Sequence, residues 1–139
     1  MRIFILVVLL LTACSKEAPP APSGGLAPGI FAAGERDALC VMGIGKVQTA
    51  GFISHGAGNE NCSASGRIVE AKGQWFLQPA GDADCRIPLR VTKEGIALGA
   101  GAAACAYYCA PGLDFAGKSF TRIAQTKARP ADLAGDALC

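Results

Sequence analysis

The distribution of seven cysteines constrains this chain more than any other feature of its sequence. One cysteine, Cys14, directly follows an apolar N-terminal run, and the other six are spread over the rest of the chain. In an exported protein, an even number of cysteines indicates a set of disulfides. Each disulfide contributes about 2–4 kcal/mol, mainly by restricting the unfolded chain. The disulfide candidates are Cys40, Cys62, Cys85, Cys105, Cys109 and Cys139.

Two details of the cysteine spacing bear on the pairing, which the sequence leaves open. Cys105 and Cys109 are four positions apart, so in a strand their Cα atoms would be about 13 Å apart. A disulfide needs about 4.4–6.8 Å. A helical turn would bring the two cysteines nearer, but their side chains would still align poorly, so we expect them to bond different partners. The tetrapeptide Asp-Ala-Leu-Cys occurs twice, ending at Cys40 and at Cys139. A bridge between those two cysteines would join the ends of the domain.

The first fourteen residues have the layout of an export signal. Arg2 supplies a positive charge, residues 3–11 form an uninterrupted apolar run, and Thr12 and Ala13 are small residues that precede Cys14. The apolar run is too short to cross a bilayer core, which needs about 20 residues. Residues 1–13 are therefore predicted to be a signal peptide, not a permanent transmembrane helix.

The tetrapeptide Leu11-Thr12-Ala13-Cys14 resembles the lipobox of bacterial lipoproteins, the substrates of signal peptidase II. The resemblance covers residues 1–14 alone. It implies that the Cys14 thiol is diacylated, that the preceding peptide is removed, and that the new amino group is acylated with a chain such as palmitate. Stable anchoring needs more than one acyl chain. Ser15 stands where an aspartate favours the inner membrane in enterobacterial lipoproteins, so the resemblance favours the outer membrane. The alternative is a plain signal peptide.

The mature chain is expected to begin with a lipidated tether and to continue as one small domain. Residues 14–30 are rich in proline, alanine and glycine and have few large apolar side chains, so they cannot form a core. Residues 31–139 contain enough large apolar side chains for one modest core. A core of this size leaves marginal stability, which disulfides would raise.

Short apolar stretches separated by glycine-rich turns predict a mostly β domain. The clearest element is the hairpin 85–98, in which apolar and polar residues alternate before the turn at residues 93–95. No sustained helical stripe is present, although one helical turn is expected within 111–116, and 105–109 reads as strand or irregular. The expected fold is a small, disulfide-bonded antiparallel β-meander, sandwich or barrel. Its predicted strands are 39–44, 47–54, 62–71, 74–78, 85–92, 96–98 and 118–123.

The charge balance argues against a polyanionic partner. Without Arg2, twelve basic side chains stand against eleven acidic ones, and no run of either sign occurs. Nucleic-acid surfaces and polybasic lipid patches need concentrated positive charge. We therefore predict no nucleic-acid partner and a membrane contact made through the lipid anchor.

Few residues fit known catalytic or ligand-binding patterns. His55 is the sole histidine, and no serine lies in the G-x-S-x-G pattern of a nucleophile elbow, so no catalytic residue is predicted. We also predict no metal site and no cofactor, with the oxygen-rich turns 59–61 and 82–84 as the alternative places for calcium. The possible binding surface is Tyr107 and Tyr108, because tyrosine combines apolar area with a polar tip. Alternatively, one tyrosine packs against the disulfides and the other lies at the surface.

These observations favour a non-enzymatic binding module in the cell envelope, facing the periplasm or the cell surface. A structural or assembly factor that contacts an envelope protein or peptidoglycan is the second interpretation, and a small hydrolase is the third. Lipid-anchored β-barrel inhibitors of lysozyme resemble this chain in overall build alone. Their Ser-Gly-x-x-Tyr signature is not met, because Ser65-Gly66 is followed by Val69 where the tyrosine belongs.

Overall fold

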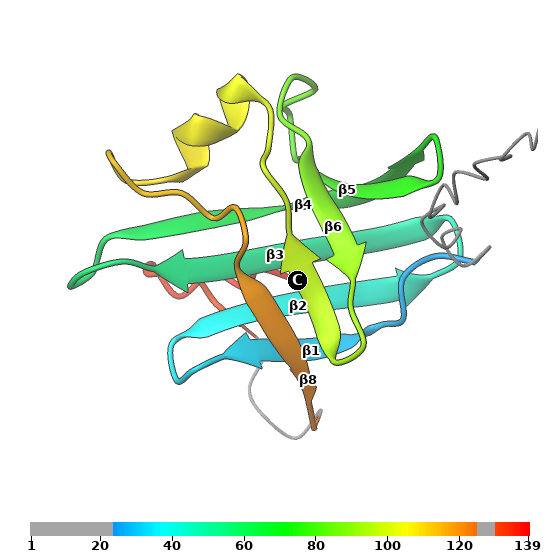
Figure 1. Cartoon of the computed structure of the whole chain (residues 1–139), viewed down its shortest axis with the longest axis horizontal. Coiled ribbons are helices and arrows are strands. Elements are labelled where there is room, and N and C mark those ends of the chain that lie inside the picture. The colour runs from blue at the N-terminus through cyan, green and yellow to red at the C-terminus, as the bar shows by residue number, and fades with distance from the viewer. Residues whose placement is uncertain (1–23, 125–129) are drawn as a thin grey trace, which may run out of the picture.

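The computed structural model describes residues 24–124 and 130–139 and shows an eight-stranded antiparallel β-barrel. Each strand pairs with the next one along the chain, and β8 pairs with β1 to close the barrel. In Figure 1, β1 to β5 run across the view while β6 and β8 cross them, so the sheet curls into two facing layers. The expected mostly β, disulfide-bonded antiparallel fold is thus confirmed, in its barrel form. The strands are β1 (Gly29–Ala33), β2 (Asp37–Ile44), β3 (Val47–His55), β4 (Asn61–Ala71), β5 (Gln74–Pro79), β6 (Ile87–Val91), β7 (Gly95–Leu98) and β8 (Ser119–Ile123).

Alternation along the strands directs every second side chain into the barrel. Phe52 on β3, for example, lies opposite Leu39 on β2 and Ala64 on β4, and all three are buried. The interior is filled by aliphatic and aromatic side chains, so it is a packed core and not a channel. Its largest fully buried members are Phe31, Phe52, Phe120, Leu39, Leu77, Ile87, Leu98 and Val41.

The folded domain begins earlier than the sequence pattern indicated. Leu26 is buried, and Gly29–Ala33 forms β1, a strand that was not predicted. Residues 26–30 were assigned to the tether because glycine, alanine and proline dominate there. β1 is nevertheless stable because it pairs on both edges, with β2 and with β8, and because it contributes Phe31 to the core.

A buried glutamine holds the entry of the chain into the barrel. The Gln48 side chain on β3 accepts a hydrogen bond from the Leu26 backbone N–H at 2.8 Å and donates one to the Leu26 carbonyl at 2.6 Å. It also donates to the carbonyl of Gly43 at 3.2 Å. Since unpaired buried amides are costly, this arrangement explains how a polar side chain is tolerated here and why Leu26 docks at this end.

All six cysteines of the described domain form disulfides, as expected. Cys40 bonds Cys139, which joins the two Asp-Ala-Leu-Cys tetrapeptides. Cys105 and Cys109 bond different partners, as their spacing predicted. Cys14 lies outside the described residues. The remaining two pairs are Cys62–Cys109 and Cys85–Cys105.

The segment after β7 differs from the expectation of a strand or irregular structure at 105–109. It begins as a short 3-10 helix, η1 (Ala103–Tyr108), which ends where Cys109 forms a bridge with Cys62. A helical turn allows Cys105 to point into the core towards Cys85 while Tyr107 points to solvent. The helical turn expected within 111–116 is absent, because isolated turns form there and bury Phe115.

The C-terminal segment packs on the outside of the barrel. Leu138 is buried against Ile53 and Cys40, which face outward from β3 and β2. A Cβ atom on Gly51 would collide with the backbone of Leu138, so the absence of a side chain at position 51 permits this close approach. The Cys40–Cys139 disulfide therefore lies in a small apolar cluster outside the barrel, separate from the main core.

Candidate functional site

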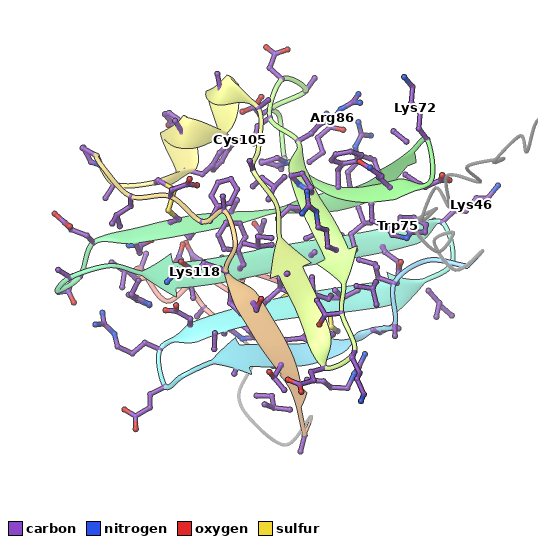
Figure 2. All side chains as sticks on the ribbon, viewed as in Figure 1. Lys46, Lys72, Trp75, Arg86, Cys105 and Lys118 are labelled. Atoms are coloured by element: carbon purple, nitrogen blue, oxygen red, sulfur yellow. A yellow bond between two sulfur atoms is a disulfide. The ribbon has the colours of Figure 1, made fainter. Side chains whose placement is uncertain are left out.

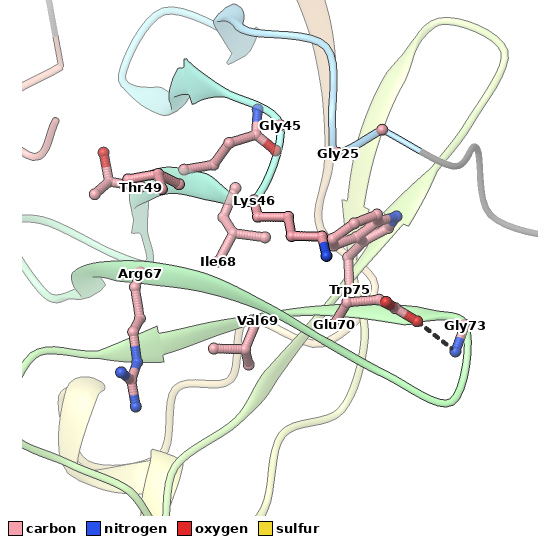
Figure 3. Close-up of a pocket in the computed structure, with 13 residues that line it drawn as sticks. Gly25, Gly45, Lys46, Thr49, Arg67, Ile68, Val69, Glu70, Gly73 and Trp75 are labelled. Atoms are coloured by element: carbon pink, nitrogen blue, oxygen red, sulfur yellow. Dashed lines mark hydrogen bonds between the residues drawn. The ribbon is translucent and has the colours of Figure 1, made fainter.

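A large hollow lies between two hairpins of the barrel. Pairing between β3 and β4 stops at Thr49 and Arg67, whereas the β2–β3 and β4–β5 hairpins continue to their tips. The two hairpins therefore diverge and leave a cleft of about 910 Å³, which Figure 3 shows in close-up. We call it the hairpin cleft. Its lining is Gly24, Gly25, Gly45, Lys46, Val47, Gln48, Thr49, Arg67, Ile68, Val69, Glu70, Gly73 and Trp75.

The chemistry of the hairpin cleft is mainly apolar, with a slight excess of positive charge. Apolar surface comes from Val47, Val69 and Trp75. The lining has two basic side chains, Lys46 and Arg67, and one acidic side chain, Glu70. Glu70 accepts a hydrogen bond from the Gly73 backbone N–H at 3.0 Å, so one of its carboxylate oxygens already has a hydrogen-bond donor within the β4–β5 turn. Apolar walls with a few polar groups are typical of ligand sites.

Trp75 is the most informative residue of the hairpin cleft. It packs partly against the core, and its indole N–H is buried without a hydrogen-bond partner among the described residues. A buried donor without an acceptor costs about 1–3 kcal/mol. An acceptor on a bound molecule would remove that cost. Trp75 is also the only tryptophan of the chain, so its fluorescence reports on the hairpin cleft alone.

The chain enters the barrel at the same place. Gly24 and Gly25 line the hairpin cleft, and Leu26 docks beside it on Gln48. Gly24, the first described residue, therefore lies beside the β2–β3 and β4–β5 hairpins.

Tyr107 and Tyr108, the residues predicted as a possible binding surface, do not lie at the hairpin cleft. They lie on η1, which Figure 1 places away from the tips of the β2–β3 and β4–β5 hairpins. Tyr107 is 86% exposed and packs edge-on against the Tyr108 ring. The Tyr108 hydroxyl donates a hydrogen bond to Asp82, and the pKa of Tyr108 is raised by burial and by the neighbouring carboxylate.

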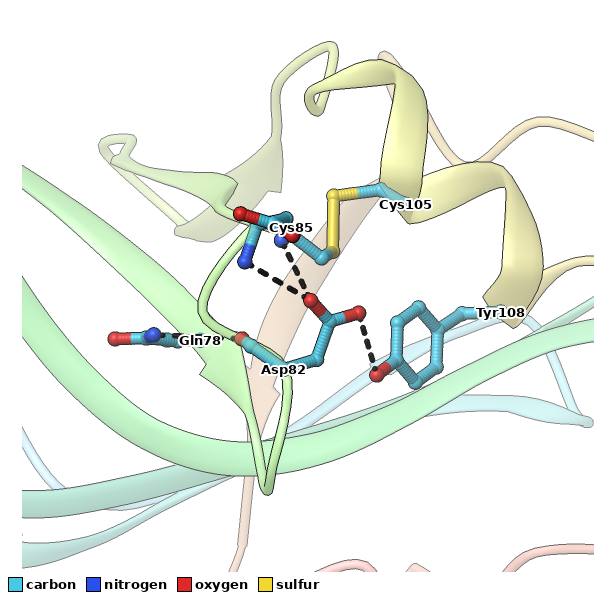
Figure 4. The surroundings of a disulfide bond; sticks show 6 residues. Gln78, Asp82, Cys85, Cys105 and Tyr108 are labelled. Carbon is cyan, nitrogen blue, oxygen red and sulfur yellow. Dashed lines mark hydrogen bonds between the residues drawn. A yellow bond between two sulfur atoms is a disulfide. The ribbon is translucent and has the colours of Figure 1, made fainter.

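The oxygen-rich turn 82–84 has a structural explanation. One carboxylate oxygen of Asp82 accepts hydrogen bonds from the backbone N–H groups of Cys85 and Asp84, and the other accepts from Tyr108 (Figure 4). These donors, the Cys85 N–H above all, outweigh desolvation and lower the pKa of Asp82. The turn thus orients Cys85 towards Cys105. Within residues 24–124 and 130–139, no cluster of three histidine, cysteine or acidic residues could hold a metal.

His55 pairs with an aspartate at the far end of β3. Its backbone N–H and its Nδ1 lie 2.8 and 3.1 Å from the same oxygen of Asp37, and Lys118 Nζ lies 3.5 Å from the other oxygen. No described serine, threonine or cysteine side chain hydrogen-bonds to His55, so this pair lacks the nucleophile of a catalytic triad. The pair instead ties β2 to β3 where both strands meet the loops.

The Asp37 cluster makes stability depend on pH. Burial raises the pKa of Asp37, but the hydrogen bonds from His55 and the charge of Lys118 lower it more, so the folded-state pKa falls below the ordinary value of 3.8. The unfolded chain then binds protons first as pH falls, so stability from Asp37 is complete above about pH 3.8 and is lost on acidification below it. In Asp37→Asn, we expect a smaller acid-induced loss of the free energy of unfolding, measured by urea titration. Equal losses in both proteins would contradict the assignment.

Comparison of the chain with known protein families, with curated proteins and with solved structures found no match. In the described part of the chain, no helix has the length and apolar character needed to cross a membrane. Sequence reasoning missed the hairpin cleft, because it treated residues 45–46 only as the break between the predicted strands 39–44 and 47–54. The one available signal was the pair of large apolar residues, Ile44 and Val47, on either side of that break.

Proposed function

We propose that this protein is a lipoprotein of the bacterial cell envelope, anchored by acyl chains on Cys14, and that its barrel is a non-enzymatic binding module. The observation that carries the binding role is the hairpin cleft, an apolar hollow with an unpaired indole donor next to a closed and fully packed barrel. The outer membrane is the favoured address, and the ligand belongs to the envelope.

Two features support binding over catalysis, and a third observation bears on the resemblance to lysozyme inhibitors. The only histidine, His55, pairs with Asp37, whose other carboxylate oxygen contacts Lys118, and no nucleophilic side chain among the described residues hydrogen-bonds to it. The interior of the barrel is filled by large side chains, so a ligand has to be held outside the core. The Ser65-Gly66 pair, which resembles part of the lysozyme-inhibitor signature, lies within β4. A Cβ atom at Gly66 would collide with the backbone of Gln78, so packing accounts for that glycine.

The lipid anchor is tested by replacing the acylated cysteine. In cells given labelled palmitate, we expect Cys14→Ser to lose the label completely and to leave the membrane fraction, because no acyl chain remains to partition into the bilayer. Ser15→Ala, next to it, should keep both the label and the membrane location. An unlabelled wild-type chain would remove the anchor from the proposal.

The hairpin cleft is tested in the same cells with a photo-reactive residue placed at position 47 or at position 133. Val47 lines the hairpin cleft and Leu133 does not, although both side chains are well exposed. Irradiation should give a discrete adduct from position 47 and none from position 133. Mass spectrometry of the adduct then identifies a protein, a glycan strand or a lipid. Absence of an adduct at position 47 would mean that the hairpin cleft is not the binding site.

A further inference from the structure

The tip of the β2–β3 hairpin exposes two aliphatic side chains on one face. Ile44 is 82% exposed and Val47 is 84% exposed, and the two residues pair directly across the hairpin. Paired residues of an antiparallel hairpin present their side chains on the same side. Together they form an apolar patch at the outermost point of the hairpin. In water, this patch has an unfavourable interaction with solvent that burial would relieve.

Positive charge from two separate hairpins flanks that patch. Lys46 lies between Ile44 and Val47 in sequence, and Lys72 lies at the tip of the neighbouring β4–β5 hairpin (Figure 2). Glu70 is the single carboxylate in the lining of the hairpin cleft, and it accepts a hydrogen bond from the Gly73 backbone N–H. The sequence shows no run of basic residues, but the fold brings these two lysines to one end. An apolar patch with lysines around it is complementary to an anionic lipid surface.

The position of the anchor points to the same surface. Nine residues separate Cys14 from Gly24, and Gly24 lines the hairpin cleft between the two tips. A chain of this length spans at most about 35 Å when fully extended. An acylated Cys14 would therefore hold Gly24, and with it the hairpin cleft, within about 35 Å of the bilayer. The short link also gives the tips a high effective concentration at the lipid surface.

We propose that the tips of the β2–β3 and β4–β5 hairpins dock on an anionic phospholipid bilayer. Ile44 and Val47 enter the headgroup region, while Lys46 and Lys72 contact phosphates. This inference rests on the proposed lipid anchor and deepens the proposed binding role, because it names the surface that the hairpin cleft faces. Docking orients the barrel with the hairpin cleft against the membrane and η1 away from it.

The test uses the lipidated protein, reconstituted into vesicles that contain phosphatidylglycerol with acyl chains brominated near the headgroup. Bromine quenches a nearby indole, and Trp75 pairs with Glu70 close to the β4–β5 tip. We expect Trp75 emission to be quenched in the wild-type protein. In Ile44→Ser/Val47→Ser, the ratio of docked to free domain should fall by at least about tenfold, since burying one aliphatic side chain is worth roughly that factor. Lys46→Glu/Lys72→Glu should also lose quenching.

Two controls make each outcome decisive. Leu133→Ser removes an exposed aliphatic side chain elsewhere and should quench as the wild type does. Circular dichroism should show all variants folded, because the replaced side chains are well exposed. A wild-type protein that enters vesicles without quenching overturns docking. Equal quenching in vesicles made only of phosphatidylcholine, brominated at the same acyl positions, overturns the assignment to anionic lipid. A protein that fails to enter vesicles at all contradicts the anchor instead.

Discussion

Replacing both Cys40 and Cys139 with alanine is expected to lower the free energy of unfolding by about 4–5 kcal/mol, the value for closure of a loop of about 100 residues. The two cysteines are 99 positions apart, so their bond restricts nearly the whole described domain in the unfolded state. In the folded state, the same bond holds Leu138 on the outer face of β2 and β3. Urea unfolding of the oxidised protein, followed by circular dichroism, measures the change.

The matched comparison is Cys85→Ala/Cys105→Ala, which removes a bond between residues 20 positions apart. The expected loss of stability is smaller, about 3 kcal/mol, because closing a shorter loop removes less conformational entropy from the unfolded chain. If the two double variants lose equal stability, loop closure is not the source of the effect. A Cys40–Cys139 variant as stable as the wild type would show that the C-terminal segment docks by packing alone.

Phe52→Ala is expected to destabilise the barrel by about 3–5 kcal/mol, the usual cost of removing a buried aromatic ring. Phe52 is fully buried in the middle of β3, and its ring meets the Phe115 ring edge-on at a centroid distance of 5.5 Å. The cavity would lie between β3 and the segment that carries Phe115. Because the barrel is closed, its strands cannot collapse inward without breaking pairing elsewhere. The measurement is again the free energy of unfolding in urea.

Tyr107→Ala provides the control for Phe52→Ala, because it removes an aromatic ring of similar size that is 86% exposed. We expect a change within about 0.5 kcal/mol, as for most surface substitutions. Phe52→Leu, which keeps most of the apolar volume, should recover much of the loss. A small effect of Phe52→Ala would mean that the core around β3 is loosely packed, contrary to its burial.

Most strand positions along the chain could be predicted, because turn residues are chemically distinctive. Lys72 and Gly73 both have positive φ, as a two-residue hairpin turn requires, and the strands on each side were predicted within a residue of their bounds. β1 was missed because its sequence, Gly-Ile-Phe-Ala-Ala, resembles the preceding tether more than a strand. Its pairing partners come from both β2 and β8, and a local pattern does not contain that information.

The disulfide pairing, too, could be predicted only in part from the sequence. The repeated tetrapeptide suggested Cys40–Cys139, and the four-residue spacing led us to expect different partners for Cys105 and Cys109. The choice between Cys62 and Cys85 as their partners depended on η1, whose helical turn places Cys105 in the core and Cys109 beside β4. Sequence patterns did not predict that turn, because alanine-rich stretches without an apolar period carry little information.

By itself, the sequence determined the class of this protein: a mostly β, disulfide-bonded domain behind a segment that resembles a lipoprotein signal. Those conclusions follow from local chemistry, namely alternating side chains, turn residues and the number of cysteines. The tertiary structure alone decided that the sheet closes, that β3 and β4 part to leave the hairpin cleft, and that Lys46 and Lys72 stand at one end beside Ile44 and Val47. These features depend on which strands pair and where pairing stops, and long-range packing sets both.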